Sequence, residues 1–237
     1  MTSRSTIVST APSPRRAVDR LFELADRDYN FTPIPFDEAV RDPNWRTDER
    51  TTTLRSEPPG PPMTGGPFEV ARQALIDYEA ADPRIVRAVY DAAVPLDGRD
   101  MVLVGRFLIL RFLMGVRVGG VVDGPEETPA GIVHRFGWNY RTLEGHLEEG
   151  QMDYELTKAD ATGEITFRVR SYSRRGRIDN PIVRWGFRVF GRHEQTRFYD
   201  RTVDRLRTIV DQRSTFAPVS SDDATVEHPD HPIDSTE

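Results

Sequence analysis

Three of the five histidines stand where a side chain could move a proton near neutral pH. His146 follows Gly145 in a turn-like segment, and Thr142, Glu144 and Glu148 are close to it in sequence. A carboxylate beside the ring would orient it for general acid–base chemistry. The competing interpretation is that the histidine only satisfies backbone groups of its turn, as polar loop residues often do. Both interpretations stay open at this stage.

His193 is the second candidate. It shares one side of a predicted C-terminal helix with Ile182, Trp185 and Val189. If that side faces a sheet, the histidine would be a polar group that orients an apolar ligand in a cavity. The alternative is a hydrogen-bonded core histidine. His146 and His193 are therefore the candidate catalytic residues, and His134, inside a predicted strand, is a weaker one.

Aromatic side chains alternate along the predicted strands and could line a pocket. Such residues also fill ordinary cores between a sheet and a helix, so their number favours a cavity only if the sheet is bent. The residues we expect to contact a ligand are Trp138, Tyr140, Thr142, His146, Tyr154, Trp185 and His193; Phe167 and Tyr172 are further aromatic candidates.

Several common mechanisms have no support in the sequence. It contains no G-x-x-x-x-G-K, H-E-x-x-H or G-x-S-x-G motif and no dinucleotide fingerprint, so no cofactor is predicted. His228 and His231 have a metal-like spacing, but they stand in an acidic tail without a third ordered ligand, and no metal site is predicted. The absence of cysteine removes disulfides and thiolate chemistry and suits a reducing compartment, so we expect a cytoplasmic protein.

The net charge of -6 gives no general attraction to nucleic acid, and no nucleic-acid partner is predicted. The most apolar stretch, residues 101–122, is interrupted by Arg106, Arg111 and Arg117, so no membrane span is expected. One basic cluster stands out. It is either a solvated helix face or a docking surface for an anionic partner, and its members are Arg174, Arg175, Arg177, Arg184, Arg188 and Arg192.

The elements that must position these residues begin with a short helix, predicted at 17–28 from its apolar spacing. Eight prolines between residues 31 and 67 forbid long helices and central strands, so this stretch should be an extended connection with room for one edge strand. A second helix should begin at Pro67 and end near Asp82. Its apolar face is formed by Phe68, Ala71, Leu75 and Tyr78.

Beyond residue 85 the apolar period changes to two, which predicts strands. A pair of strands is expected within 101–123, followed by strands at 131–140, 151–158 and 164–173. In the last of these, apolar and polar side chains alternate, which is typical of a half-buried antiparallel strand. Bulges or bends, and hence a strongly curled sheet, are indicated by Gly105, Gly115, Gly119 and Gly120.

The last element is a helix of about thirty residues that begins at Pro181, well above the average length. Its apolar side rotates by about a third of a turn between the two halves, which predicts a bend or break near Gly191. The polar, acidic residues after 212 lack the apolar side chains needed for a core, so a disordered tail is expected.

The segment from Phe136 to His146 has the pattern F-G-x-x-Y-x-T-L-x-G-H. Together with the Tyr-Ser-Arg turn at Tyr172 and a Pro-started helix that carries Tyr199, it resembles a family of domains of unknown function. That family is similar to the START-like superfamily, also called polyketide cyclase and lipid-transport or SRPBCC. The resemblance implies a helix-grip fold, in which a curved antiparallel sheet holds a long C-terminal helix around a cavity.

The predicted fold class is therefore α+β, with a START-like helix-grip domain at 68–213. It is preceded by a disordered tail at 1–16 and by the short helix and Pro-rich connection at 17–67, and it is followed by a disordered acidic tail at 214–237. Three functions compete: binding of a small apolar or amphipathic molecule in the cavity, interaction through the basic cluster, and cyclase- or isomerase-like catalysis by a cavity histidine. The sequence ranks binding first and leaves the oligomeric state undetermined.

Overall fold

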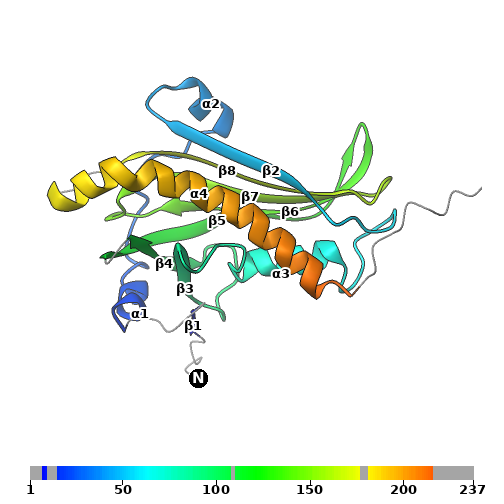
Figure 1. Ribbon diagram of the computed structural model, residues 1–237, viewed down its shortest axis with the longest axis horizontal. Coiled ribbons are helices and arrows are strands. Elements are labelled where there is room, and N and C mark those ends of the chain that lie inside the picture. Colours follow the sequence, from blue (N-terminus) through cyan, green and yellow to red (C-terminus); the bar gives the residue numbers. More distant parts are fainter. Residues whose placement is uncertain (1–6, 10–14, 108–109, 177–180, 216–237) are drawn as a thin grey trace, which may run out of the picture.

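One antiparallel sheet of eight strands organises the molecule (Figure 1). The computed structural model describes residues 7–9, 15–107, 110–176 and 181–215, and only the backbone in 7–9, 106–107, 110–111 and 181–196. The strands follow the order β1-β3-β4-β5-β6-β7-β8-β2 across the sheet. Their bounds are β1 Ile7–Ser9, β2 Arg46–Leu54, β3 Val86–Asp91, β4 Asp100–Phe107, β5 Leu110–Thr128, β6 Gly131–Thr142, β7 Glu148–Ala159 and β8 Ile165–Arg175.

The concave face of the curved sheet carries the main core. The helices α3 (Pro67–Ile76) and α4 (Pro181–Arg213) cover this face, and α3 lies beside the C-terminal half of α4 (Figure 1). Strand β8 shows the expected alternation, because Ile165, Phe167 and Val169 are fully buried while the residues between them stay partly exposed. The fold is thus mixed α+β, with a curved antiparallel sheet and a C-terminal helix.

The opposite face of the sheet is covered at two places by the N-terminal third. Helix α1 (Arg15–Phe22) packs Ala17 and Leu21 onto Val89, Val102 and other outward residues of β3 and β4. This explains why consecutive residues of β3 and β4 are buried, since each face of these strands has its own cover.

The second cover lies over Tyr172, which points away from the main core and is nevertheless fully buried. Phe31 and Trp45 pack edge-on against its ring, at 6.0 and 5.0 Å between ring centroids. Helix α2 (Phe36–Arg41) contributes Ala39 to the same cluster. The Pro-rich stretch therefore folds back on the sheet as a covering layer.

Strand β2, inside that stretch, is the edge strand that the prolines permit, and it pairs with β8 along its whole length. Strand β1 pairs with β3 at the other edge, so part of the tail expected to be disordered, 1–16, forms a strand, and α1 begins at Arg15. Residues 216–237, most of the predicted acidic tail, lie outside the described residues. Among the described residues, none of the helices has the length and hydrophobicity needed to cross a lipid bilayer.

Two predicted helix ends are wrong. Helix α1 ends at Phe22 and not at Asp28. The helix that begins at Pro67 ends at Ile76 and not near Asp82, because Tyr78 takes a left-handed backbone conformation (φ 57°) that stops the helix. Helix α4 runs without interruption past Gly191, so the helix does not break there, and the alternative of a bend stays a prediction. The predicted sheet bulge is present, with a register shift between Gly119 and Val122, whereas Gly105 and Gly115 pair regularly.

A buried carboxylate fixes the start of α3. The side chain of Glu57 is fully buried and accepts hydrogen bonds from the amides of Met63 (3.1 Å) and Phe68 (2.8 Å). The second amide belongs to the first turn of α3, where a negative charge also interacts favourably with the helix dipole. The helix therefore begins where this carboxylate stands.

The countercharge is Lys158, the only lysine of the chain, whose side chain is also fully buried. Its Nζ lies 3.9 Å from a carboxylate oxygen of Glu57 and donates a hydrogen bond to the carbonyl of Gly60. Gly163, in the turn between β7 and β8, has φ +73°, and a Cβ there would lie 1.8 Å from the carbonyl oxygen of Glu57. The Pro-rich segment is thus locked onto the β7–β8 turn.

Replacing Glu57 by glutamine should lower the free energy of unfolding by about 3 kcal/mol, because it leaves the ammonium of Lys158 buried without a countercharge. Urea unfolding measures this change. The matched control is Glu126→Gln, whose half-exposed carboxylate pairs with Arg135 and should contribute less than about 1 kcal/mol. Equal effects of the two substitutions would contradict the role assigned to the buried pair.

Candidate functional site

Four aromatic residues meet at the centre of the concave face: Tyr78 after α3, Trp138 and Tyr140 on β6, and Tyr154 on β7. Every pair among them has ring centroids between 4.9 and 6.4 Å apart. We call this group the tyrosine cluster. The side-chain period of two explains how β6 delivers two members to one face, and Trp138 lies opposite Tyr154 in the β6–β7 ladder.

Tyr78 reaches the cluster through an unusual helix end. The amide of Glu79 bonds to the carbonyl of Ala74 (2.8 Å), and the amide of Tyr78 bonds to that of Leu75 (3.2 Å), which is the hydrogen-bond pattern of a Schellman motif. The left-handed position of this motif usually holds glycine, because a side chain there is strained by about 1 kcal/mol or more. Tyrosine occupies it here and is 3 % exposed.

Burial dominates the electrostatics of the cluster. It raises the pKa of the Tyr78, Tyr140 and Tyr154 hydroxyls well above the ordinary value of 10, because a phenolate loses its hydration there. The neighbouring tyrosines modify these pKa values further through their mutual charges and hydrogen bonding. All three hydroxyls are therefore neutral at physiological pH, and they act as hydrogen-bond donors and acceptors and not as bases.

The polar atoms of the cluster are incompletely satisfied by the described residues. The hydroxyls of Tyr78 and Tyr154 lie close enough to other tyrosines to influence their pKa, yet neither completes a hydrogen bond of normal geometry within the described part of the chain. The same holds for Nε1 of Trp138. Almost all buried polar groups in proteins are hydrogen-bonded, so these three atoms in one cluster are unusual among the described residues.

Tyr199, on α4, shows the contrasting, satisfied arrangement. Its hydroxyl forms a short hydrogen bond with the hydroxyl of Ser171 on β8. Burial raises the pKa of Tyr199 far above 10, and the bond to Ser171 partly offsets this rise. The pair joins α4 to the sheet at the border of the cluster.

The structure brings together Trp138, Tyr140 and Tyr154 of the predicted ligand-contacting residues. The side chains of Trp185 and His193, and those of Arg184, Arg188 and Arg192, lie outside the described part of the structure. The prediction did not include Tyr78, Ser171 and Tyr199. Tyr78 had a sequence signal, its place on the apolar face of α3, but the spacing made it part of a helix and hid the turn that points its hydroxyl into the sheet.

Thr142 and His146 lie apart from these rings, where β6 turns into β7. The hydroxyl of Thr142 donates to Oδ1 of Asn30 (2.6 Å) and accepts from the amide of Gly150 (3.0 Å). Nδ1 of His146 lies 2.9 Å from the amide nitrogen and 3.0 Å from the carbonyl oxygen of Glu148, so the ring binds this backbone in either tautomer. Both side chains join backbone segments of the turn.

Burial also decides the charge of His146. It lowers the pKa of the imidazole to about 4, and the contact with the Glu148 carbonyl offsets only part of this effect. The ring is neutral at physiological pH. A carboxylate was expected to orient this ring. Among the described residues, the ring is instead hydrogen-bonded to the backbone of Glu148.

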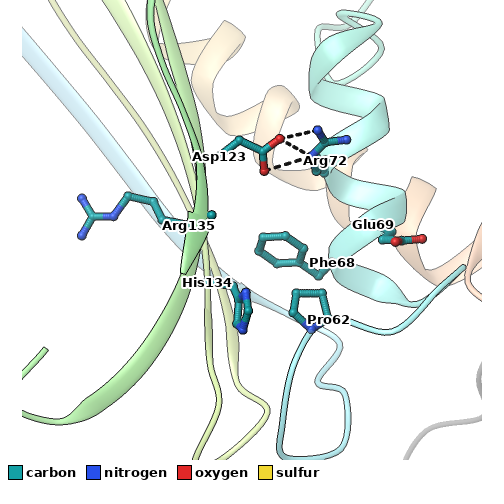
Figure 2. A pocket seen from close by; sticks show the side chains of 8 residues that line it. Pro62, Phe68, Glu69, Arg72, Asp123, His134 and Arg135 are labelled. Atoms are coloured by element: carbon teal, nitrogen blue, oxygen red, sulfur yellow. Dashed lines mark hydrogen bonds and ion pairs between the residues drawn. The ribbon is translucent and has the colours of Figure 1, made fainter. Parts of the chain in front are cut away.

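A separate pocket of about 210 Å³ lies between α3 and the β5–β6 hairpin (Figure 2). Figure 2 shows Phe68 and Pro62 facing His134, whereas Arg135 points away across the strand. Arg72 forms an ion pair with Asp123, and Nε2 of His134 lies 3.1 Å from the carboxylate of Asp160. Each charged group that could attract a ligand here already has a partner, so this pocket is a weaker candidate than the tyrosine cluster.

The described side chains form no evident metal site. Among residues 15–107, 110–176 and 181–215 with described side chains, no group of three or more His, Asp or Glu residues is arranged to hold a metal ion. His228 and His231 lie outside the described residues.

Comparisons with known proteins identify a family and a set of distant structures. A family model described as "Domain of unknown function (DUF1990)" matches residues 36–205. No curated protein matches the chain.

A hypothetical protein, jhp0584, from Helicobacter pylori is 11% identical with a TM-score of 0.42, over 76% of this chain and 96% of that chain. The crystal structure of Ara h 8.0201 is 10% identical with a TM-score of 0.42, over 71% of this chain and 99% of that chain.

The unpaired hydroxyl of Tyr154 should contribute nothing to stability. Tyr154→Phe is expected to leave the free energy of unfolding unchanged or to raise it by about 1 kcal/mol, because it removes a buried polar group without a good partner. Ser171→Ala is the matched comparison and should lower it by about 1–2 kcal/mol, since it leaves the hydroxyl of Tyr199 unpaired. Denaturant unfolding distinguishes them; a clear destabilisation by Tyr154→Phe would show that this hydroxyl is satisfied.

His146 should make the fold sensitive to mild acid. Its pKa of about 4 in the folded state lies below the unfolded value of 6.5, so its contribution is complete above pH 6.5 and is lost as the pH falls toward 4. The expected loss between pH 7.5 and 5 is about 2 kcal/mol. Urea unfolding of the wild type and His146→Gln at both pH values measures it as the difference between the two proteins; equal pH dependence would contradict the assigned pKa.

Proposed function

Because this chain belongs to the DUF1990 family, whose description names no activity, its function has to be argued from the site, and we propose that it binds a small apolar or amphipathic molecule in a START-like cavity. In this arrangement the curved sheet and α4 form a helix grip around the ligand. The ligand contacts the tyrosine cluster. The proposal rests on the chemistry of that cluster and not on the likeness to the solved structures.

The observation that carries the proposal is the set of buried polar atoms without good partners. Tyr78 and Tyr154 are each 3 % exposed, and burying an unpaired hydroxyl costs about 1–3 kcal/mol. A core that served only for packing would gain stability from phenylalanine at both positions. The chain nevertheless keeps both hydroxyls and a strained backbone at Tyr78. This is expected where these tyrosines are needed for binding and not for packing.

The apolar rings around these hydroxyls match what small-molecule sites require. Such sites are lined mainly by apolar and aromatic side chains with a few polar groups that orient the ligand. Phe167 stacks on Tyr154 with an interplanar angle of 12°, and Phe136 and Phe198 belong to the same core. We therefore include Trp138, Tyr140 and Tyr154 among the ligand contacts, as the sequence predicts, and add Tyr78; Trp185 and His193 stay predicted contacts from α4.

A set of arginines would keep such a site in one geometry. Arg201 pairs with Asp82 (2.6 Å), and Arg205 donates to the carbonyl of Glu79 (2.6 Å), so α4 is tied to the segment that follows Tyr78. On its other side Arg50 of β2 pairs with Asp200 (2.8 Å). Partly exposed ion pairs contribute little stability individually, but together they fix the position of α4 relative to α3 and β2. A fixed frame lowers the entropic cost of binding.

The test is to identify what the protein carries. We expect that protein purified from the cells that naturally produce it holds a stoichiometric apolar molecule, detected by native mass spectrometry and identified after solvent extraction. Tyr78→Leu should lose this molecule, because it removes a hydroxyl and reshapes the cluster, whereas Tyr29→Leu, at a partly exposed tyrosine, should retain it. Circular dichroism confirms that both variants fold.

A bare wild-type protein would contradict the proposal if it also fails to take up any apolar compound from an extract of the same cells. Retention of the molecule by Tyr78→Leu together with its loss from Tyr29→Leu would place the ligand elsewhere.

A further inference from the structure

We propose that the ligand of the tyrosine cluster is a neutral, flat molecule with a carbonyl-type acceptor oxygen, such as an aromatic ketone or a quinone. This inference rests on the proposed function, since it names the chemical class that the same site would take. The oxygen would accept hydrogen bonds from Nε1 of Trp138 and from the hydroxyl of Tyr78 or Tyr154.

The type of these polar atoms sets the type of the ligand group. Nε1 of Trp138 can only donate a hydrogen bond, because the lone pair of the indole nitrogen is delocalised in the aromatic ring. The hydroxyls of Tyr78 and Tyr154 each supply one further donor. A ligand group that accepts hydrogen bonds suits all three atoms, whereas a group that only donates would leave the indole nitrogen unpaired. A carbonyl oxygen with two lone pairs accepts two of these bonds, and the remaining hydroxyl can donate to a neighbouring tyrosine of the cluster.

The four residues of the tyrosine cluster, whose side chains are all described, carry no charge at neutral pH, which favours a neutral ligand. The pKa values of its tyrosines respond to burial and to one another. Next to the cluster, Asp153 and Glu155 of β7 and Arg168 and Arg170 of β8 point to the opposite face of the sheet. There Arg168 pairs with Glu155, and Arg170 pairs with Asp153. An ion brought into the cluster would lose its hydration without gaining a countercharge among these residues, at a cost far above that of a neutral oxygen.

The rings of the cluster favour a flat skeleton. Trp138 and Tyr154 lie 4.9 Å apart with 34° between their planes, and Phe167 lies nearly parallel to Tyr154 at 6.5 Å. Aromatic rings pack well against the faces and edges of other rings. A planar ring system that carries the acceptor oxygen at its edge would therefore contact the aromatic surface and the donors together.

The backbone strain at Tyr78 supports a role for its hydroxyl. Glycine would relieve the left-handed conformation at this helix end, but it would remove both the ring and the donor from the cluster. Two of the three unsatisfied atoms come from residues whose backbone lies in regular strands, and the third comes from this strained position. The backbone strain at Tyr78 is expected if the protein needs the hydroxyl of this residue as a hydrogen-bond donor.

The experiment compares two probes of nearly identical shape, 2-acetylnaphthalene and 2-isopropenylnaphthalene, in which a C=O group and a C=CH₂ group occupy the same place. Equilibrium dialysis gives Kd for each probe with the wild type and with the double variant Tyr78→Phe/Tyr154→Phe, which keeps both rings. The quantity of interest is the ratio of the alkene Kd to the ketone Kd, and its change between proteins cancels the difference in hydrophobicity between the probes.

We expect this ratio to fall about tenfold in the double variant, with the alkene affinity nearly unchanged, because only the ketone loses hydrogen bonds. Tyr29→Phe is the control and should leave the ratio as in the wild type. If both probes bind and the ratio does not change, the site is an apolar pocket without carbonyl recognition, which overturns this inference and leaves the proposed function standing. If neither probe binds the wild type, this inference is wrong, whereas the proposed function fails only if the protein also takes up no apolar compound from a cell extract.

Discussion

The buried pair of Glu57 and Lys158 is the constraint on which the rest of the structure depends. Two opposite charges are removed from water, and each is compensated by backbone hydrogen bonds as well as by the other. Such a pair tolerates little displacement, because a lost contact leaves a charge uncompensated in a low-dielectric interior. It ties together three parts of the chain that are distant in sequence: the Pro-rich segment, the first turn of α3 and the end of β7.

The buried pair also determines the geometry of the tyrosine cluster. The carboxylate of Glu57 fixes where α3 begins, and the helix then ends at Ile76. At that end the chain turns through the left-handed conformation of Tyr78 and places the ring between the sheet and α4. The same turn presents Glu79 and Asp82 to arginines of α4, so one short segment both contributes to the tyrosine cluster and holds the helix that covers it.

Both faces of the sheet are covered, but with different chemistry. The outward covers are small hydrophobic clusters around Val102 and Tyr172, and the hydroxyl of Tyr172 accepts the amide proton of Ile34 at 3.2 Å. The concave face carries the tyrosine cluster, where hydroxyls are buried without equally good partners. Covering layers need only exclude water. The concave face is thus the one where buried hydroxyls lack good partners among the described residues, and the proposed ligand would supply such partners.

Local patterns were sufficient for much of the fold. Alternation in 164–173 and the glycines near 119 and 120 predicted antiparallel strands with a bulge, and Pro181 predicted the start of the last helix. These signals are carried by neighbouring residues and by the side-chain period, so a single segment contains them. Strand β2 was foreseeable as an edge strand for the same reason, because prolines flank it and none lies inside it.

The sequence by itself determined the strands from β3 to β8, the presence of α1, α3 and α4, and the aromatic residues that β6 and β7 place on one face. Only the tertiary structure decided that Tyr78 ends its helix and joins them, since helical spacing alone continues the helix through this residue. It also decided that His146 is buried and neutral, because the pKa depends on what covers the ring and not on its neighbours in sequence. Neighbouring residues in the sequence specify the local conformation. The charge of a side chain, its backbone strain and its hydrogen bonds depend on segments that come together only in the folded protein.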